Sequence, residues 1–376
     1  MLKMIQKSFL IKQLEMKTLS TGIVYTSRYL DHDTGPFHPE SPARLLGIAE
    51  RLERNEIMGK PFGATIGPRI ASREEIELVH SPRYIGFVKE CCEKGVQHLD
   101  SDTPICPESY DVALLAAGGV LLACERVNSR EFDNAIALVR PPGHHAGANG
   151  RALTASSAGF CIFNNIAVAA MKLIKTLGFQ RVLILDFDCH HGNGTQEIFY
   201  NSAEVMYVSL HQDGRTLYPG TGSVEEIGEG EGVGYTINIP YPPAAADDAF
   251  IKAMDYVVEP VVKQFDPEWV LVSVGFDSLH DDPISSLQMS SQGYKELFQR
   301  TKDLARTHSS GKWVAALEGG YGKTVPDAAL SAISAMSDVH YDPIDTSRKT
   351  MPNVMTKVEA VIKTSRKSLS SYWSLR

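Results

Sequence analysis

The chain has 376 residues, of which 43% are hydrophobic and 22% are charged, a composition typical of a globular protein. Lysine and arginine together number 37 against 45 acidic residues, and the resulting net charge of −8 argues against a strongly basic nucleic-acid-binding protein. Runs of about 18 apolar residues, as a transmembrane helix needs, are absent, so we expect neither a membrane partner nor a direct nucleic-acid partner.

Residues 1–17 are amphipathic and carry lysines, but they lack the long apolar core and the small-residue cleavage site of a signal peptide. We therefore interpret residues 1–20 as an N-terminal extension. The six cysteines form no Cys-x-x-Cys pair, which predicts reduced thiols and a cytoplasmic protein. No low-complexity linker divides the rest, so residues 21–376 are predicted to form one domain.

Short, nearly continuous runs rich in Val and Ile predict strands that are buried on both faces of a sheet. Segments with apolar residues at helical spacing separate them, and residues 342–376 predict a terminal helix packed outside. This alternation predicts an α/β fold with a mostly parallel sheet and helices on both faces. In chain order, the predicted strands are residues 22–25, 135–139, 181–185, 205–210, 236–239, 270–274 and 313–317, and the predicted helices are residues 108–127, 160–177, 247–265, 291–305 and 326–336.

Polar and glycine-rich segments follow four of these strands directly. They are residues 140–146 (RPPGHHA), 186–194 (DFDCHHGNG), 275–283 (GFDSLHDDP) and 318–322 (EGGYG). Ligands bind at the carboxyl ends of parallel strands, and in a parallel sheet all four ends lie along one edge. The functional site is therefore expected there.

Asp188 and His190 are two residues apart at a strand end, so their side chains are expected on the same side. An isolated Asp-x-His pair is most often structural, but Asp277 follows another strand and supplies a third donor. Three N and O ligands with an open position are the pattern of a catalytic zinc site, although the same set suits iron(II). Asp186 could hydrogen-bond an imidazole or bind a second cation.

The adjacent His144 and His145 follow a stiff Pro-Pro-Gly turn and fit general acid–base work. A lone histidine is more often a core residue, but these two stand among other polar strand ends. Tyr321 lies between glycines, and its hydroxyl could donate to a developing oxyanion. Taken alone, Tyr321 would be interpreted as a packing residue.

Seven ordered motifs between about residues 22 and 335 resemble the histone deacetylase superfamily, which includes bacterial and archaeal deacetylases and acetylpolyamine amidohydrolases. The motifs lie at residues 38–44, 140–146, 159–161, 186–194, 218–222, 275–283 and 318–322. The resemblance implies that residues 21–376 form a deacetylase-like catalytic domain. The implied architecture is a single three-layer α/β/α domain with a central parallel sheet of about eight strands, like that of arginase.

The resemblance also assigns roles at matching positions. It implies zinc ligands at Asp188, His190 and Asp277, a general base and acid at His145, an electrostatic partner at His144 oriented by Asp186, and a carbonyl-polarising hydroxyl at Tyr321. Asn193, where class I relatives have Asp and class II relatives Asn, would give His145 a neutral partner. Gly159, Phe160 and Tyr218 match residues of the substrate tunnel, and Ile284 matches an apolar position at its rim. Arg44 matches a residue of the inner channel. Asp186 and Ser209 match a structural potassium site.

The implied activity is zinc-dependent removal of an acetyl or other acyl group from an acetylated lysine of a peptide or protein, or from a similar small amine. An acetylpolyamine amidohydrolase, a deacetylase of another metabolite and a non-catalytic acetyl-lysine binder remain as alternatives. An arginase-like ureohydrolase would need carboxylates where Gly192 and Leu279 stand. Residues 31–42 match a loop that can join subunits in relatives, so a homo-oligomer stays open.

Overall fold

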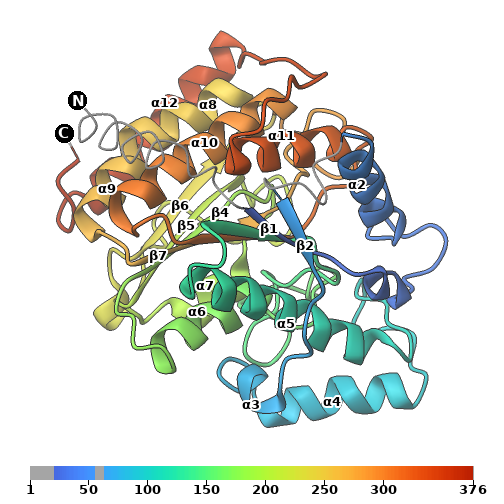
Figure 1. The fold of residues 1–376 in the computed structure, drawn as a ribbon. Helices are drawn as coiled ribbons and strands as arrows, with labels where there is room; N and C mark the ends of the chain where they lie inside the picture. Colours follow the sequence, from blue (N-terminus) through green and yellow to red (C-terminus); the bar gives the residue numbers. More distant parts are fainter. Residues whose placement is uncertain (1–20, 56–62, 376) are drawn as a thin grey trace, which may run out of the picture.

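The computed structural model describes residues 21–55 and 63–375. Within that part of the chain, eight parallel strands form one sheet in the order β2-β1-β3-β8-β7-β4-β5-β6 (Figure 1). The predicted fold class is therefore confirmed. The strands are β1 (Thr21–Val24), β2 (Gly63–Ile66), β3 (Asn134–Ala137), β4 (Val182–Asp186), β5 (Val205–Gln212), β6 (Thr236–Tyr241), β7 (Trp269–Val274) and β8 (Trp313–Leu317).

Seven of these strands were predicted from their apolar runs, and every residue in them is buried. Burial on both faces explains why their sequences do not alternate between apolar and polar residues. The sequence analysis missed β2, which lies at the edge of the sheet and, among the described residues, pairs only with β1. Ala64 and Thr65 of β2 are exposed, so this strand lacks the apolar signal of the others.

Helices cover both faces of the sheet, as Figure 1 shows: α8–α12 lie on one side, and α3–α7 lie on the other. The long helices α5 and α10 coincide closely with predicted ranges, and the predicted terminal helix is α12, which packs against β6 and α8. The helices are α2 (Ala43–Arg54), α3 (Arg73–Ile76), α4 (Pro82–Glu93), α5 (Ser109–Asn128), α6 (Asn165–Lys175), α7 (Asn193–Phe199), α8 (Asp247–Ala253), α9 (Glu259–Phe265), α10 (Ser291–His308), α11 (Val325–Ser337) and α12 (Pro352–Leu369).

Two predicted helices were partly wrong. The helix expected over residues 160–177 begins only at Asn165, because Phe160 has a positive φ of 68° and the Asn164 side chain caps the helix by accepting from the Ala167 N–H at 3.0 Å. The range 247–265 is two α-helices joined by a π-helical turn, Met254–Val258. Spacing of apolar residues alone does not reveal such a turn.

The predicted extension, residues 1–20, lies outside the described residues. None of the helices in residues 21–55 and 63–375 is long and apolar enough to cross a membrane. The strands β3, β8, β7 and β4 are consecutive neighbours in the sheet. Their carboxyl ends carry the four polar segments singled out above, so the sheet topology brings these segments together.

Candidate active site

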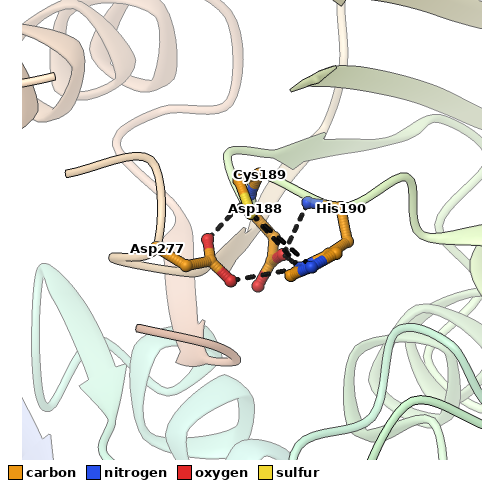
Figure 2. Close-up of side chains that lie close together, drawn as sticks. All are labelled: Asp188, Cys189, His190 and Asp277. Carbon is orange, nitrogen blue, oxygen red and sulfur yellow. Dashed lines mark hydrogen bonds and ion pairs between the residues drawn. The ribbon is translucent and has the colours of Figure 1, made fainter. Parts of the chain in front are cut away.

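The predicted metal ligands Asp188, His190 and Asp277 meet at the ends of β4 and β7 (Figure 2). Nδ1 of His190 lies 3.0 Å from Oδ1 of Asp188 and 3.3 Å from Oδ2 of Asp277. All three residues are at least nine-tenths buried. The structure thus brings Asp277 together with Asp188 and His190, although Asp277 lies at least 87 positions away from either of them in the sequence.

The donor set fits a cation. Oδ2 of Asp277 is buried and has no hydrogen-bond partner among the described residues. Burial and the negative charge of Asp188 raise the pKa of Asp277. Burial alone would lower the pKa of His190, but the two carboxylates raise it to about 10, so the pocket favours a positive charge. A Cβ on Gly319 would lie 2.1 Å from Oδ2 of Asp277, and only glycine leaves that space open.

The thiol of Cys189 also lies in this cluster, which the sequence analysis did not anticipate. Its Sγ is 3.3 Å from Nδ1 of His190, and its backbone N–H donates to Oδ1 of Asp277 at 2.8 Å (Figure 2). The position of Cys189 between Asp188 and His190 in the sequence could have suggested it. However, side chains alternate along an extended segment, which predicted that the thiol would point away from those two residues.

His145 is held in one tautomer by Asn193. Nδ2 of Asn193 donates to the carbonyl oxygen of Ala152 at 3.0 Å, so Oδ1 of Asn193 is the atom that faces Nδ1 of His145 at 2.7 Å. An amide oxygen only accepts, so Nδ1 carries the hydrogen and Nε2 keeps its lone pair. Burial, together with the charges of His144 and His190, holds the pKa of His145 well below its usual value.

His144 has charged partners instead. Its Nδ1 lies 3.0 Å from Oδ2 of Asp186, which also accepts from the hydroxyl of Tyr207 at 2.9 Å, and its Nε2 lies 3.8 Å from Oδ1 of Asp188. Burial would lower the pKa of His144, but the charges of Asp188 and Asp186 raise it to about 10. The two adjacent imidazoles therefore differ: His144 favours the charged form and His145 the neutral form.

Tyr321 is fixed from three directions. Its backbone N–H donates to Oδ2 of Asp282 at 2.8 Å, and the guanidinium carbon of Arg44 lies 4.7 Å from its ring centroid. The ring of Phe160 meets it edge-on at 6.0 Å. Burial raises the pKa of Tyr321 well above its usual value, so the hydroxyl keeps its proton and can donate a hydrogen bond.

A cavity of about 250 Å³ opens onto these groups. Of the predicted site residues, it is lined by His144, His145, Gly159, Phe160, Asp188, His190, Tyr218, Ile284 and Tyr321. Gly159 has φ of +53°, and a Cβ there would lie 2.5 Å from the His145 ring, so glycine is required where the wall approaches the imidazole. The ring of Tyr218 also lies against Gly159, and its hydroxyl donates to the carbonyl oxygen of Ser157 at 2.8 Å, which fixes the tyrosine in the cavity wall.

Arg44 and Ser209 do not line this cavity. Arg44 donates to Glu40 and to the carbonyl oxygens of Glu318 and Gly320, so each of its three guanidinium nitrogens makes a hydrogen bond within the protein. Ser209 is paired with Asp186 in the register of β5 and β4, and its hydroxyl lies 2.7 Å from Nδ1 of His211. The inner-channel role of Arg44 and the potassium site at Asp186 and Ser209 stay predictions.

Two carboxylates near the site received no role from the sequence. Asp102 lines the cavity, and its Oδ2 accepts from the hydroxyl of Ser157 at 2.7 Å. Glu318 is 1% exposed at the end of β8, and burial raises its pKa to about 7. Glu318 is the first residue of the Glu-Gly-Gly-Tyr segment, and its place directly after a strand could have identified it as a site residue. Asp102 does not follow a predicted strand, so its position in the sequence offers no such indication.

Comparison with known proteins agrees with this geometry. Residues 38–336 match the histone deacetylase domain. The chain is 39% identical over 363 residues to a probable deacetylase of Archaeoglobus fulgidus, covering 94% of this chain and 98% of that protein. It is also 39% identical over 303 residues to a histone deacetylase-like amidohydrolase of Pseudomonas aeruginosa, covering 80% of this chain and 77% of the relative.

Among solved structures, the crystal structure of the HDA15 HD domain matches with a TM-score of 0.83 and 33% sequence identity, covering 94% of this chain and 98% of that one. The family match over residues 38–336 includes the strand ends that carry the site. The chain therefore belongs to the histone deacetylase family and is a hydrolytic deacetylase.

Proposed function

We propose that this deacetylase is a zinc-dependent amidohydrolase that removes an acetyl group from the side chain of acetylated lysine in peptides or proteins. The observation that carries the proposal is that one cavity is lined by the neutral His145, by Tyr321, and by Asp188 and His190, which form a donor set with the adjoining Asp277. A base, a metal-binding set and an oxyanion donor in one cavity are what amide hydrolysis requires.

His145 acts as base and then as acid. Nε2 of His145 carries the free lone pair because Nδ1 donates to Asn193. Nε2 accepts a proton from the attacking water and returns it to the leaving amine, which would otherwise depart as an unstable anion. His144, held by Asp186, contributes positive charge beside the developing negative charge.

Tyr321 donates its hydroxyl hydrogen to the acetamide oxygen as that oxygen becomes negative. Asp188, His190 and Asp277 would hold the metal, and a bound zinc ion would polarise the same carbonyl and lower the pKa of water at the site. Iron(II) suits the same donors, so the identity of the metal as zinc belongs to the proposal.

The cavity walls favour a neutral, acylated butyl chain. Phe160, Leu217, Tyr218 and Ile284 present mainly apolar surface, and desolvating the ammonium of a free lysine between these side chains would be costly. One observation favours a second candidate, an acetylpolyamine: the carboxylate of Asp102 lines the cavity and could attract a second ammonium. Ile284 offers no such carboxylate.

A substrate panel tests the proposal. We expect a higher kcat/KM for acetyl-lysine peptides than for acetylspermidine or acetylputrescine, measured as acetate release. Arginine serves as the control for a ureohydrolase. Preference for the acetylpolyamines would change the assigned substrate but not the proposed deacetylation mechanism. Urea release from arginine would refute that mechanism.

A further inference from the structure

Glu318 is a buried carboxylate that the proposed chemistry does not use. It follows β8 directly, is 1% exposed and does not line the substrate cavity. Its Oε2 accepts from the backbone N–H groups of Gly143 at 2.6 Å and His144 at 3.2 Å. Its Oε1 accepts from the hydroxyl of Ser273 in β7 at 3.0 Å. One side chain therefore connects the ends of three adjacent strands.

The two N–H groups belong to the turn after β3 that carries both imidazoles. Buried backbone donors need acceptors, and here Glu318 is the acceptor for both. On its other side, the same turn is held by α7, because the carbonyl oxygen of His144 accepts from the Thr195 N–H at 3.0 Å. The turn that aims His145 is thus fixed between β8 and α7.

The residue after Glu318 reaches the metal-binding set. The backbone N–H of Gly319 donates to Oδ2 of Asp188 at 2.9 Å. Two consecutive residues at the end of β8 therefore fix the turn that bears the base and one carboxylate of the donor set. Their relative position decides where Nε2 of His145 stands with respect to Asp188.

We infer that Glu318 is a positioning residue for His145: its carboxylate fixes the turn of Gly143 and His144 so that the imidazole is aligned with the donor set at the end of β4. The inference rests on the proposed role of His145. Glu318 touches neither the cavity nor the substrate, so it acts on the rate of the chemical step rather than on binding.

The test compares variants of the metal-loaded full chain. Glu318→Ala should lower kcat about 10- to 100-fold, as expected for a misaligned catalytic group, with KM changed less than about twofold. Bound metal per chain, measured by elemental analysis, should stay at the wild-type value. Glu318→Gln should recover most of the loss, because its amide oxygen can accept from both N–H groups while its NH₂ donates to the hydroxyl of Ser273.

Asp247→Ala is the matched control. Asp247 is 6% exposed and also accepts from two backbone N–H groups and one serine hydroxyl, those of Ser290 and Arg348. It does not line the cavity. This variant should lose a comparable amount of thermal stability while keeping the wild-type kcat, which separates positioning from general destabilisation.

If Glu318→Ala does not fold, Glu318→Asp takes its place, since a shorter side chain withdraws the carboxylate from the turn but keeps its charge. It should lower kcat about tenfold with KM unchanged. Three results would overturn the inference: a wild-type kcat in the folded Glu318 variant, a loss of kcat that is proportional to the loss of bound metal, or an equal loss of kcat in Asp247→Ala. A wild-type chain inactive on every acetylated substrate would instead refute the proposed function.

Discussion

Replacing Glu40 by Gln should strongly destabilise the protein. Glu40 is fully buried and accepts from Nε and Nη2 of Arg140 at 2.6 and 2.7 Å and from Nη1 of Arg44 at 2.9 Å. Burial alone would raise the pKa of Glu40, but the charges of Arg140 and Arg44 lower it from 4.5 to about 2. At about 1.4 kcal/mol per pKa unit, the ionised form contributes about 3 kcal/mol of stability at neutral pH.

The Gln variant keeps the shape but removes the charge and turns an N–H₂ group toward a guanidinium. Breaking a buried ion pair in this way costs about 3–5 kcal/mol, in the same range. We therefore expect the free energy of unfolding in urea at pH 7 to fall by about 3 kcal/mol. Glu90→Gln is the control: Glu90 in α4 pairs with Lys94 directly after that helix, both side chains are exposed, and loss of the pair should leave stability nearly unchanged.

The pH dependence makes the test sharper. The folded-state pKa of Glu40 lies below the unfolded value of 4.5, so its stabilisation is complete above pH 4.5 and is lost as pH falls toward about 2. The difference between the wild type and Glu40→Gln should thus shrink from about 3 kcal/mol at pH 7 to about 2 kcal/mol at pH 3.5. A loss below about 1 kcal/mol at pH 7, or a difference that does not shrink on acidification, would refute the reasoning.

Three further predictions concern the site. After extensive dialysis, elemental analysis should find about one zinc-like ion per chain held by the Asp188, His190 and Asp277 set, and two catalytic manganese ions in a crystal would contradict this. At matched metal loading, His145→Ala should lose about 10²- to 10⁴-fold in kcat and more than His144→Ala, because only His145 is assigned both proton transfers; near-normal turnover would overturn that assignment. Tyr321→Phe should fold, keep its metal and lose about 10²- to 10³-fold in kcat, whereas wild-type turnover would make Tyr321 a packing residue.

Local sequence determined most of the strands and the composition of the site. Buried parallel strands have continuous apolar sequences, so seven of the eight strands were predicted from the sequence. The exposed edge strand β2 was not. The polar segments after β3, β4, β7 and β8 could be assigned to one edge, since every parallel strand ends on the same side. The spacing of Asp188 and His190 then indicated a metal site.

Only the tertiary structure decided how these groups are joined. The strand order places the end of β8 between those of β3 and β7, so Glu318 meets Gly143 across 175 residues of sequence. Asn193 fixes the tautomer of His145 only because its own amide is oriented by the distant carbonyl of Ala152. Glu40 and Arg140 pair across 100 residues. Such contacts depend on strand order and register, which arise from the packing of the whole chain and leave no periodic pattern in the local sequence.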